Sequence, residues 1–98
     1  MRLTNDQVMA IKSAVSRHFG ESAKVWLFGP RVDDQARGGD IDLYIETEME
    51  QGVLEAELKA RVELLKQHGD RKIDLVIRRV GQAPTAIHGI AKETGILL

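Results

Sequence analysis

The sequence contains no cysteine, and its formal net charge is only -1. Without cysteine the chain forms neither disulfide bonds nor thiolate metal sites, so a cytoplasmic location is the simplest expectation. The small net charge gives no electrostatic reason to expect tight binding to nucleic acid. No stretch resembles a signal peptide, and no apolar run approaches the roughly 20 residues that span a bilayer. We therefore expect a cytoplasmic protein without a membrane partner.

The length limits how much function one chain can hold. With 98 residues and 10.9 kDa, residues 1–98 are expected to form a single domain with one core and one site. A separate domain for an acceptor substrate does not fit in this length. The acceptor is therefore expected to be another macromolecule, or a second subunit completes the site.

The first half of the chain alternates between helical and strand patterns. Thr4 and Gln7 form a capping box, which predicts a helix over 5–19 that ends at Gly20. The apolar residues of this helix recur at helical spacing: Val8, Ile11, Val15 and Phe19. The stretches 24–28 and 40–46 are rich in β-forming residues, and we expect both to be strands.

The second half predicts two more helices and one more strand. A helix over 54–67 carries four apolar residues along one face, Leu54, Leu58, Val62 and Leu65, while its charged residues, Glu55, Glu57, Lys59, Arg61 and Glu63, are expected to face solvent. A strand over 72–77 follows. A short last helix is expected to begin near Pro84, with an apolar face of Ile87, Ile90 and Ala91, before the apolar tail 96–98.

This order, α-β-β-α-β-α, predicts the fold class. A single crossover helix separates the second and third strands, which is typical of a parallel pair. We expect an α/β domain of the α+β type, with a small mixed β-sheet and helices packed on one face. Trp26 is expected in the core, and the three histidines are scattered without the spacing of metal ligands.

Two aspartates interrupt the otherwise apolar second strand. Because side chains alternate across a strand, Asp40 and Asp42 share one face while Ile41 and Leu43 belong to the core. The same alternation puts Asp74 of the third strand outside the core. If the two strands are neighbours, the three carboxylates share one patch, where their mutual repulsion calls for a cation.

Carboxylates without nearby histidine or cysteine suit Mg²⁺ or Mn²⁺. Two such ions about 4 Å apart are the usual arrangement for in-line attack on phosphorus. The three aspartates therefore indicate phosphoryl or nucleotidyl transfer. The other reading of these residues, solvated carboxylates at an exposed sheet edge, becomes less favoured when the three are taken together with the preceding turn.

That turn supplies the expected phosphate site. Gly29 ends the first strand and allows the backbone to approach a ligand closely, and the segment 30–39 is longer than most connections. Arg31 and Arg37 lie in this segment. An arginine pairs bidentately with phosphate oxygens, so either side chain is a candidate for a triphosphate contact or, equally, for a solvated loop position.

The pattern resembles a known family. A strand ending in "FG", a loop, "GDIDL", a helix and then "IDLVI" are similar to the minimal nucleotidyltransferases of the DNA polymerase β type superfamily, and the similarity extends over nearly the whole chain to "AKETGILL". The resemblance implies that Asp40 and Asp42 hold two Mg²⁺ or Mn²⁺ ions. It also implies that Asp74 binds the catalytic ion and helps to activate the acceptor hydroxyl.

The resemblance also implies a substrate and a partner. The nucleotide would lie against Gly29, Pro30, Arg31, Gly39, Asp40 and Asp42, and an NTP, with ATP as the expected donor, would transfer its NMP to a hydroxyl. Members of the family commonly accompany a HEPN-domain protein, as the antitoxin of a toxin–antitoxin pair. The alternatives are a degenerate domain that neutralises its partner by complex formation alone, and a metal or nucleotide sensor.

One position departs from the family pattern. The family turn is Gly-Ser, and its serine contacts the β- and γ-phosphates, whereas this chain has Pro30. Proline offers neither a hydroxyl nor a backbone N–H. Weak binding of Mg-ATP is therefore expected.

Overall fold

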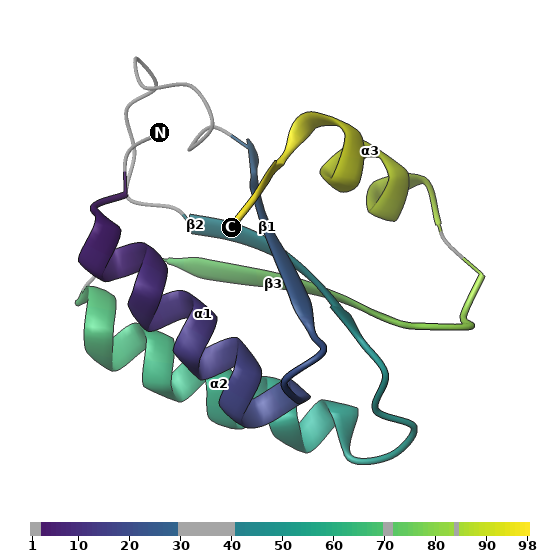
Figure 1. Cartoon of the computed structure of the whole chain (residues 1–98), viewed down its shortest axis with the longest axis horizontal. Helices are drawn as coiled ribbons and strands as arrows, with labels where there is room; N and C mark the ends of the chain where they lie inside the picture. Colours follow the sequence, from purple (N-terminus) through teal and green to yellow (C-terminus); the bar gives the residue numbers. More distant parts are fainter. Residues whose placement is uncertain (1–2, 30–40, 70–71, 84) are drawn as a thin grey trace.

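A computed structural model describes residues 3–29, 41–69, 72–83 and 85–98. The elements run in the predicted order with one added strand: α1 (Asn5–Phe19), β1 (Lys24–Phe28), β2 (Ile41–Thr47), α2 (Val53–His68), β3 (Ile73–Arg79), α3 (Ala86–Thr94) and β4 (Ile96–Leu97). The strands form one mixed sheet in the order β3-β2-β1-β4 (Figure 1). β2 and β3 are parallel, and the other pairs are antiparallel.

The main core lies between the sheet and the first two helices. α1 begins with the predicted capping box, in which the Thr4 and Gln7 side chains each accept a hydrogen bond from the other residue's backbone N–H. Its buried residues pack with α2 against alternate positions of the strands, where Leu27, Leu43 and Ile45 are fully buried. α1 and α2 lie side by side on this face of the sheet (Figure 1). The α+β architecture predicted from the sequence is confirmed.

α2 turns a different face to the sheet from the one predicted. Its buried residues are Ala56, Ala60, Leu64 and His68, whereas Leu54, Leu58, Val62 and Leu65 are exposed. Three of the charged positions expected in solvent, Glu57, Arg61 and Glu63, are instead half-buried. Arg61 donates a hydrogen bond to the carbonyl of Ile73, and Glu63 accepts from Arg17 of α1. The small alanine side chains let α2 approach the core closely, and this contact replaces burial of the larger aliphatic stripe.

α3 covers the opposite face of the sheet. The expectation that all helices pack on one face is therefore wrong for α3. Trp26, Tyr44 and Ala91 form a second buried cluster there, and the Trp26 and Tyr44 rings lie 5.2 Å apart. Of the apolar residues predicted for α3, only Ala91 is buried, while Ile87 and Ile90 are exposed. His88 is buried instead, and it accepts a hydrogen bond from the Thr85 N–H at the start of the helix. Pro84 lies outside the described residues.

The apolar tail forms the edge strand β4, which the sequence did not predict. Ile96 and Leu97 pair with Leu27 and Trp26 of β1, and the Leu98 N–H donates to the Val25 carbonyl. Gly95 permits the close turn from α3 into this strand, because a Cβ there would lie 2.4 Å from the Ala91 carbonyl oxygen. The strand therefore extends the sheet by one short element.

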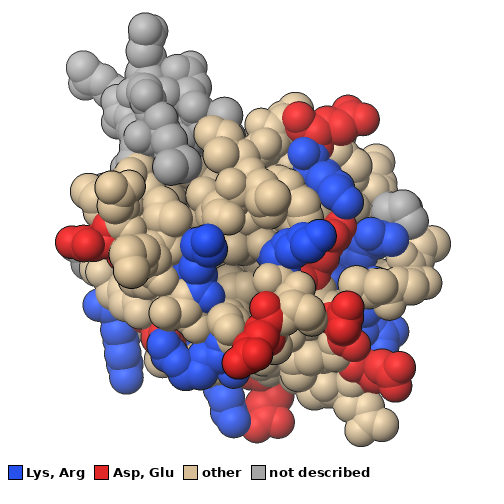
Figure 2. Space-filling view, viewed as in Figure 1, with Lys and Arg blue, Asp and Glu red and all other residues tan. Residues whose placement is uncertain are grey.

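The surface carries charges of both signs. On the face seen in Figure 2, the described Lys and Arg side chains alternate with Asp and Glu, and no wide area of this face carries one sign. None of the helices in the described part of the chain is both long enough and apolar enough to cross a bilayer.

Candidate functional site

Asp42 and Asp74 lie next to each other on neighbouring parallel strands. They are register partners in the β2–β3 pair, so their Cα atoms are separated by about one inter-strand spacing, ~4.8 Å. Both belong to the face opposite α1 and α2, since their neighbours Ile41, Leu43 and Ile73 are buried in the main core. The condition on which the predicted patch depends, that the two strands are neighbours, is therefore met for Asp42 and Asp74.

Gly29 fits closely against Asp42. Phe28 pairs with Asp42 across the β1–β2 ladder, and Gly29 follows with a φ of +76°. A Cβ at Gly29 would lie 2.4 Å from Oδ2 of Asp42, which is closer than real side chains approach. Glycine suits this position on two counts, because it adopts the left-handed backbone without strain and because a Cβ here would force the Asp42 carboxylate to shift.

Lys72 provides a nearby positive charge. Its Nζ lies 3.9 Å from Oδ2 of Asp74, and the Asp74 side chain is 43% exposed. This ammonium group offsets part of the negative charge of Asp74, and the exposed Asp74 carboxylate still leaves room for water and a further cation. Two carboxylates and open solvent suit Mg²⁺ or Mn²⁺, which keep several water ligands.

The rest of the predicted site lies outside the described residues. Pro30, Arg31, Arg37, Gly39 and Asp40 all belong to the segment 30–40. Within the described ranges, no group of three or more His, Asp or Glu side chains has the arrangement of a metal site. The structure therefore brings together Asp42, Asp74 and Gly29, and the position of Asp40 stays a prediction.

A second polar cluster, not predicted from the sequence, lies further along the same face. Glu46 accepts hydrogen bonds from the Tyr44 hydroxyl at 2.6 Å and from Arg78 and Lys92 at 3.3 Å each. Lys92 also lies over the Trp26 ring, 5.3 Å from its centroid. The alternation that placed Asp42 and Tyr44 on one face includes Glu46, so the sequence carried a signal for this residue.

This cluster fastens α3 to the sheet. Burial raises the pKa of the Tyr44 hydroxyl, so it stays protonated and donates to Glu46. Burial on its own would raise the pKa of Glu46 as well, but the hydrogen bonds from Tyr44 and Lys92 and the charge of Arg78 outweigh it and lower the pKa. Glu46 is thus held as a carboxylate between two strands and a helix.

Replacing Glu46 by glutamine is expected to destabilise the fold by about 1.5–3 kcal/mol at pH 7, because hydrogen bonds to a charged group are lost. The folded pKa lies below the ordinary value of 4.5, so this stabilisation is present above that pH and disappears as pH falls through the folded pKa. Urea unfolding of both proteins at pH 7 and below pH 4 measures the difference. Glu93→Gln, at an exposed position of α3 next to Lys92, is the control. A difference that persists unchanged in acid would contradict this account.

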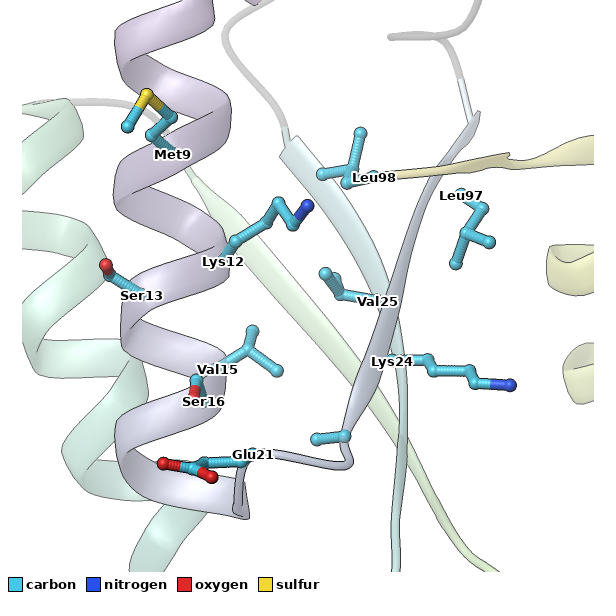
Figure 3. Close-up of a pocket in the computed structure, with 11 residues that line it drawn as sticks. Met9, Lys12, Ser13, Val15, Ser16, Glu21, Lys24, Val25, Leu97 and Leu98 are labelled. Atoms are coloured by element: carbon cyan, nitrogen blue, oxygen red, sulfur yellow. The ribbon is translucent and has the colours of Figure 1, made fainter.

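A shallow groove lies between α1 and the edge of the sheet that β1 and β4 form (Figure 3). It has a volume of about 610 Å³. Met9 and Lys12 of α1 line one wall, Leu97 and Leu98 the other, and Lys12 extends toward Leu98. Neither Asp42 nor Asp74 lines this groove, and its walls carry no paired carboxylates. The carboxylate pair is therefore the better candidate for chemistry.

Comparison of the whole chain with protein-family models and with curated proteins finds no match in either case.

Proposed function

We propose that this protein is a metal-dependent nucleotidyltransferase. The observation that supports the proposal best is the register of β2 and β3, which pairs Asp42 with Asp74 beside the close-packed Gly29 turn. Each of these three residues is one that the motif resemblance assigns to the site. The donor set also agrees, because carboxylate oxygens are the ligands that Mg²⁺ and Mn²⁺ prefer.

The proposed reaction moves an NMP from an NTP, with ATP as the expected donor, to a hydroxyl group. The hydroxyl oxygen would attack the α-phosphorus and pass its proton to the Asp74 carboxylate and from there to solvent, while a new P–O bond forms and the bond to the β-phosphate oxygen breaks to release pyrophosphate. Asp40, Asp42 and Asp74 would hold two Mg²⁺ or Mn²⁺ ions, which stabilise the negative charge that develops on the phosphoryl oxygens. Asp74 would also accept the hydrogen bond of the attacking hydroxyl and orient it.

Pro30→Ser is expected to tighten the binding of Mg-ATP about tenfold or more. The serine restores a hydroxyl and a backbone N–H, and a single additional charge-assisted hydrogen bond of about 1.4 kcal/mol accounts for a tenfold change in Kd. Titration calorimetry of the two proteins measures the difference. Equal affinities would mean that the triphosphate does not contact position 30.

The acceptor is proposed to be a partner macromolecule in the cytoplasm, and a HEPN-domain protein is the partner that the motif resemblance favours. The described surface gives no support for a nucleic-acid acceptor on the face in Figure 2, where the charges alternate in sign. In this role the chain would act as an antitoxin that modifies its partner covalently.

The test is to incubate the chain with Mg²⁺ and ATP labelled at the α-phosphate, together with the protein that co-purifies with it. Mass spectrometry of the partner is expected to show the added mass of one or more AMP groups. A stable complex without any transferred nucleotide would overturn the catalytic proposal. That outcome would favour the degenerate domain that acts by complex formation, which Pro30 makes the second candidate.

A further inference from the structure

The exposed side of α2 carries a continuous apolar stripe, which we define as Leu54, Leu58, Val62 and Leu65. Their exposed fractions are 71%, 55%, 53% and 40%. On a helix these positions lie along one side, and they extend over about 16 Å at 1.5 Å per residue. Aliphatic side chains exposed singly are ordinary, but four in a row along one helix are typical of a contact surface.

We propose that the α2 stripe is the interface of a homodimer in which the α2 helices of two copies pack antiparallel. This inference does not depend on the proposed function. The stripe is nearly symmetric about residue 60, so an antiparallel two-fold arrangement puts Leu54 against Leu65 of the second copy and Leu58 against Val62 of the second copy. Each apolar side chain then has an apolar partner, as an isologous interface requires.

The charges beside the stripe favour the antiparallel arrangement. Glu55 lies near the beginning of the helix and Lys66 near its end, on the same flank of the stripe. A two-fold axis through the middle of the helix brings Glu55 of one copy next to Lys66 of the other, twice in the dimer. On the opposite flank Glu57 and Arg61 form an ion pair within one copy, at 3.8 Å, so this flank presents no uncompensated like charges to the second copy. The helix surface is therefore complementary to itself in charge as well as in shape.

The size of the interface sets its strength. One helix pair of this length buries less than the roughly 800 Å² per partner of a standard interface. Because such small interfaces gain little beyond the cost of association, we expect a Kd of about 10–100 µM. The dimer would leave the Asp42–Asp74 face accessible, since that face lies on the other side of the sheet from α2.

The matched variants are Leu58→Glu on α2 and Ile90→Glu on α3. Both residues are 55% exposed, so the two substitutions place the same charge at equally exposed apolar positions. Sedimentation equilibrium from about 5 to 500 µM spans the expected Kd. We expect the unmodified chain and Ile90→Glu to form dimers and Leu58→Glu to remain monomeric at every concentration. Circular dichroism confirms that each variant is folded.

Charge reversal tests the antiparallel arrangement itself. Glu55→Lys alone and Lys66→Glu alone are each expected to weaken the dimer severalfold, and the double variant is expected to restore it. A chain that stays monomeric at 500 µM, or a dimer that Leu58→Glu leaves intact, would overturn the proposal. Failure of the double reversal to restore the dimer would overturn the antiparallel arrangement.

Discussion

Replacing Asp74 by alanine is expected to abolish AMP transfer, lowering the rate by about 1,000-fold or more. Loss of a ligand that holds the catalytic ion and orients the hydroxyl removes stabilisation that exists mainly in the transition state, and a factor of 1,000 corresponds to about 4 kcal/mol. The fold is expected to change little, because the side chain is 43% exposed and lies outside the main core. A thermal melt and a transfer assay on the same preparation measure both quantities.

The control for Asp74 is Glu48→Ala. Glu48 is exposed and directly follows β2, at the opposite end of the strand from Asp42. The substitution therefore removes one negative charge far from the carboxylate pair. Its transfer rate is expected to remain within about twofold of the unmodified protein, because exposed charges this far away contribute little. If Asp74→Ala and Glu48→Ala retain the same activity, the chemistry takes place elsewhere.

Replacing Gly29 by alanine is expected to weaken binding of the divalent metal by about 10- to 100-fold, the range found when a group that orients a metal ligand is changed. The new Cβ would lie 2.4 Å from Oδ2 of Asp42, and the carboxylate must therefore move by about 1 Å to reach an ordinary contact. The φ of +76° adds a strain of about 1–2 kcal/mol, so the melting temperature is expected to fall by about 5–15 °C.

Gly81→Ala separates these two effects. Gly81 also has a left-handed backbone, with a φ of +95°, but no atom lies within 4 Å of a Cβ built there. Both variants are expected to lose stability from backbone strain, and only Gly29→Ala is expected to lose metal affinity. The metal affinities are measured by titration calorimetry with Mn²⁺. Equal affinities in the two variants would mean that Gly29 does not affect the metal site.

The backbone arrangement of the site was predictable from the sequence because each part of it depends on local patterns. The alternation of Ile41, Asp42 and Leu43 sets the face of each aspartate, and the crossover helix predicts that β2 and β3 are parallel; that they are also neighbours is what the structure adds. The cost of an aspartate within a strand was the physical signal that marked the position. Neither inference required knowledge of distant contacts.

The orientation of the helices was not predictable in the same way. The four large aliphatic residues of α2 have the spacing of a core face, but the helix packs through Ala56 and Ala60, which allow a closer approach to the sheet. How closely a helix approaches the sheet depends on all the side chains packed in the core. The periodic pattern of one helix carries no information about those other side chains. α3 lies on the opposite face, where its Ala91 packs against the aromatic rings of Trp26 and Tyr44. This contact also depends on residues far apart in the sequence.

The Glu46 cluster shows the same limit at the level of single residues. The strand pattern puts Glu46 on the face of Asp42, but its charged partners, Arg78 and Lys92, come from β3 and from α3, 32 and 46 residues further along the chain. Ion pairs over such separations depend on the tertiary arrangement. The ion pairs of Glu46 therefore could not be predicted without the position of α3 on the sheet.

The most direct test of the carboxylate pair is a Mn²⁺ titration followed by electron paramagnetic resonance, in which only the free ion gives a strong signal. This measurement needs no acceptor and no partner. The unmodified chain is expected to reduce the free Mn²⁺ signal, and the double variant Asp42→Asn/Asp74→Asn is expected to leave it at the level of buffer, whereas Glu48→Gln behaves like the unmodified chain. Equal loss of the signal with the double variant and the unmodified chain, or no loss with either, would contradict a metal site at Asp42 and Asp74.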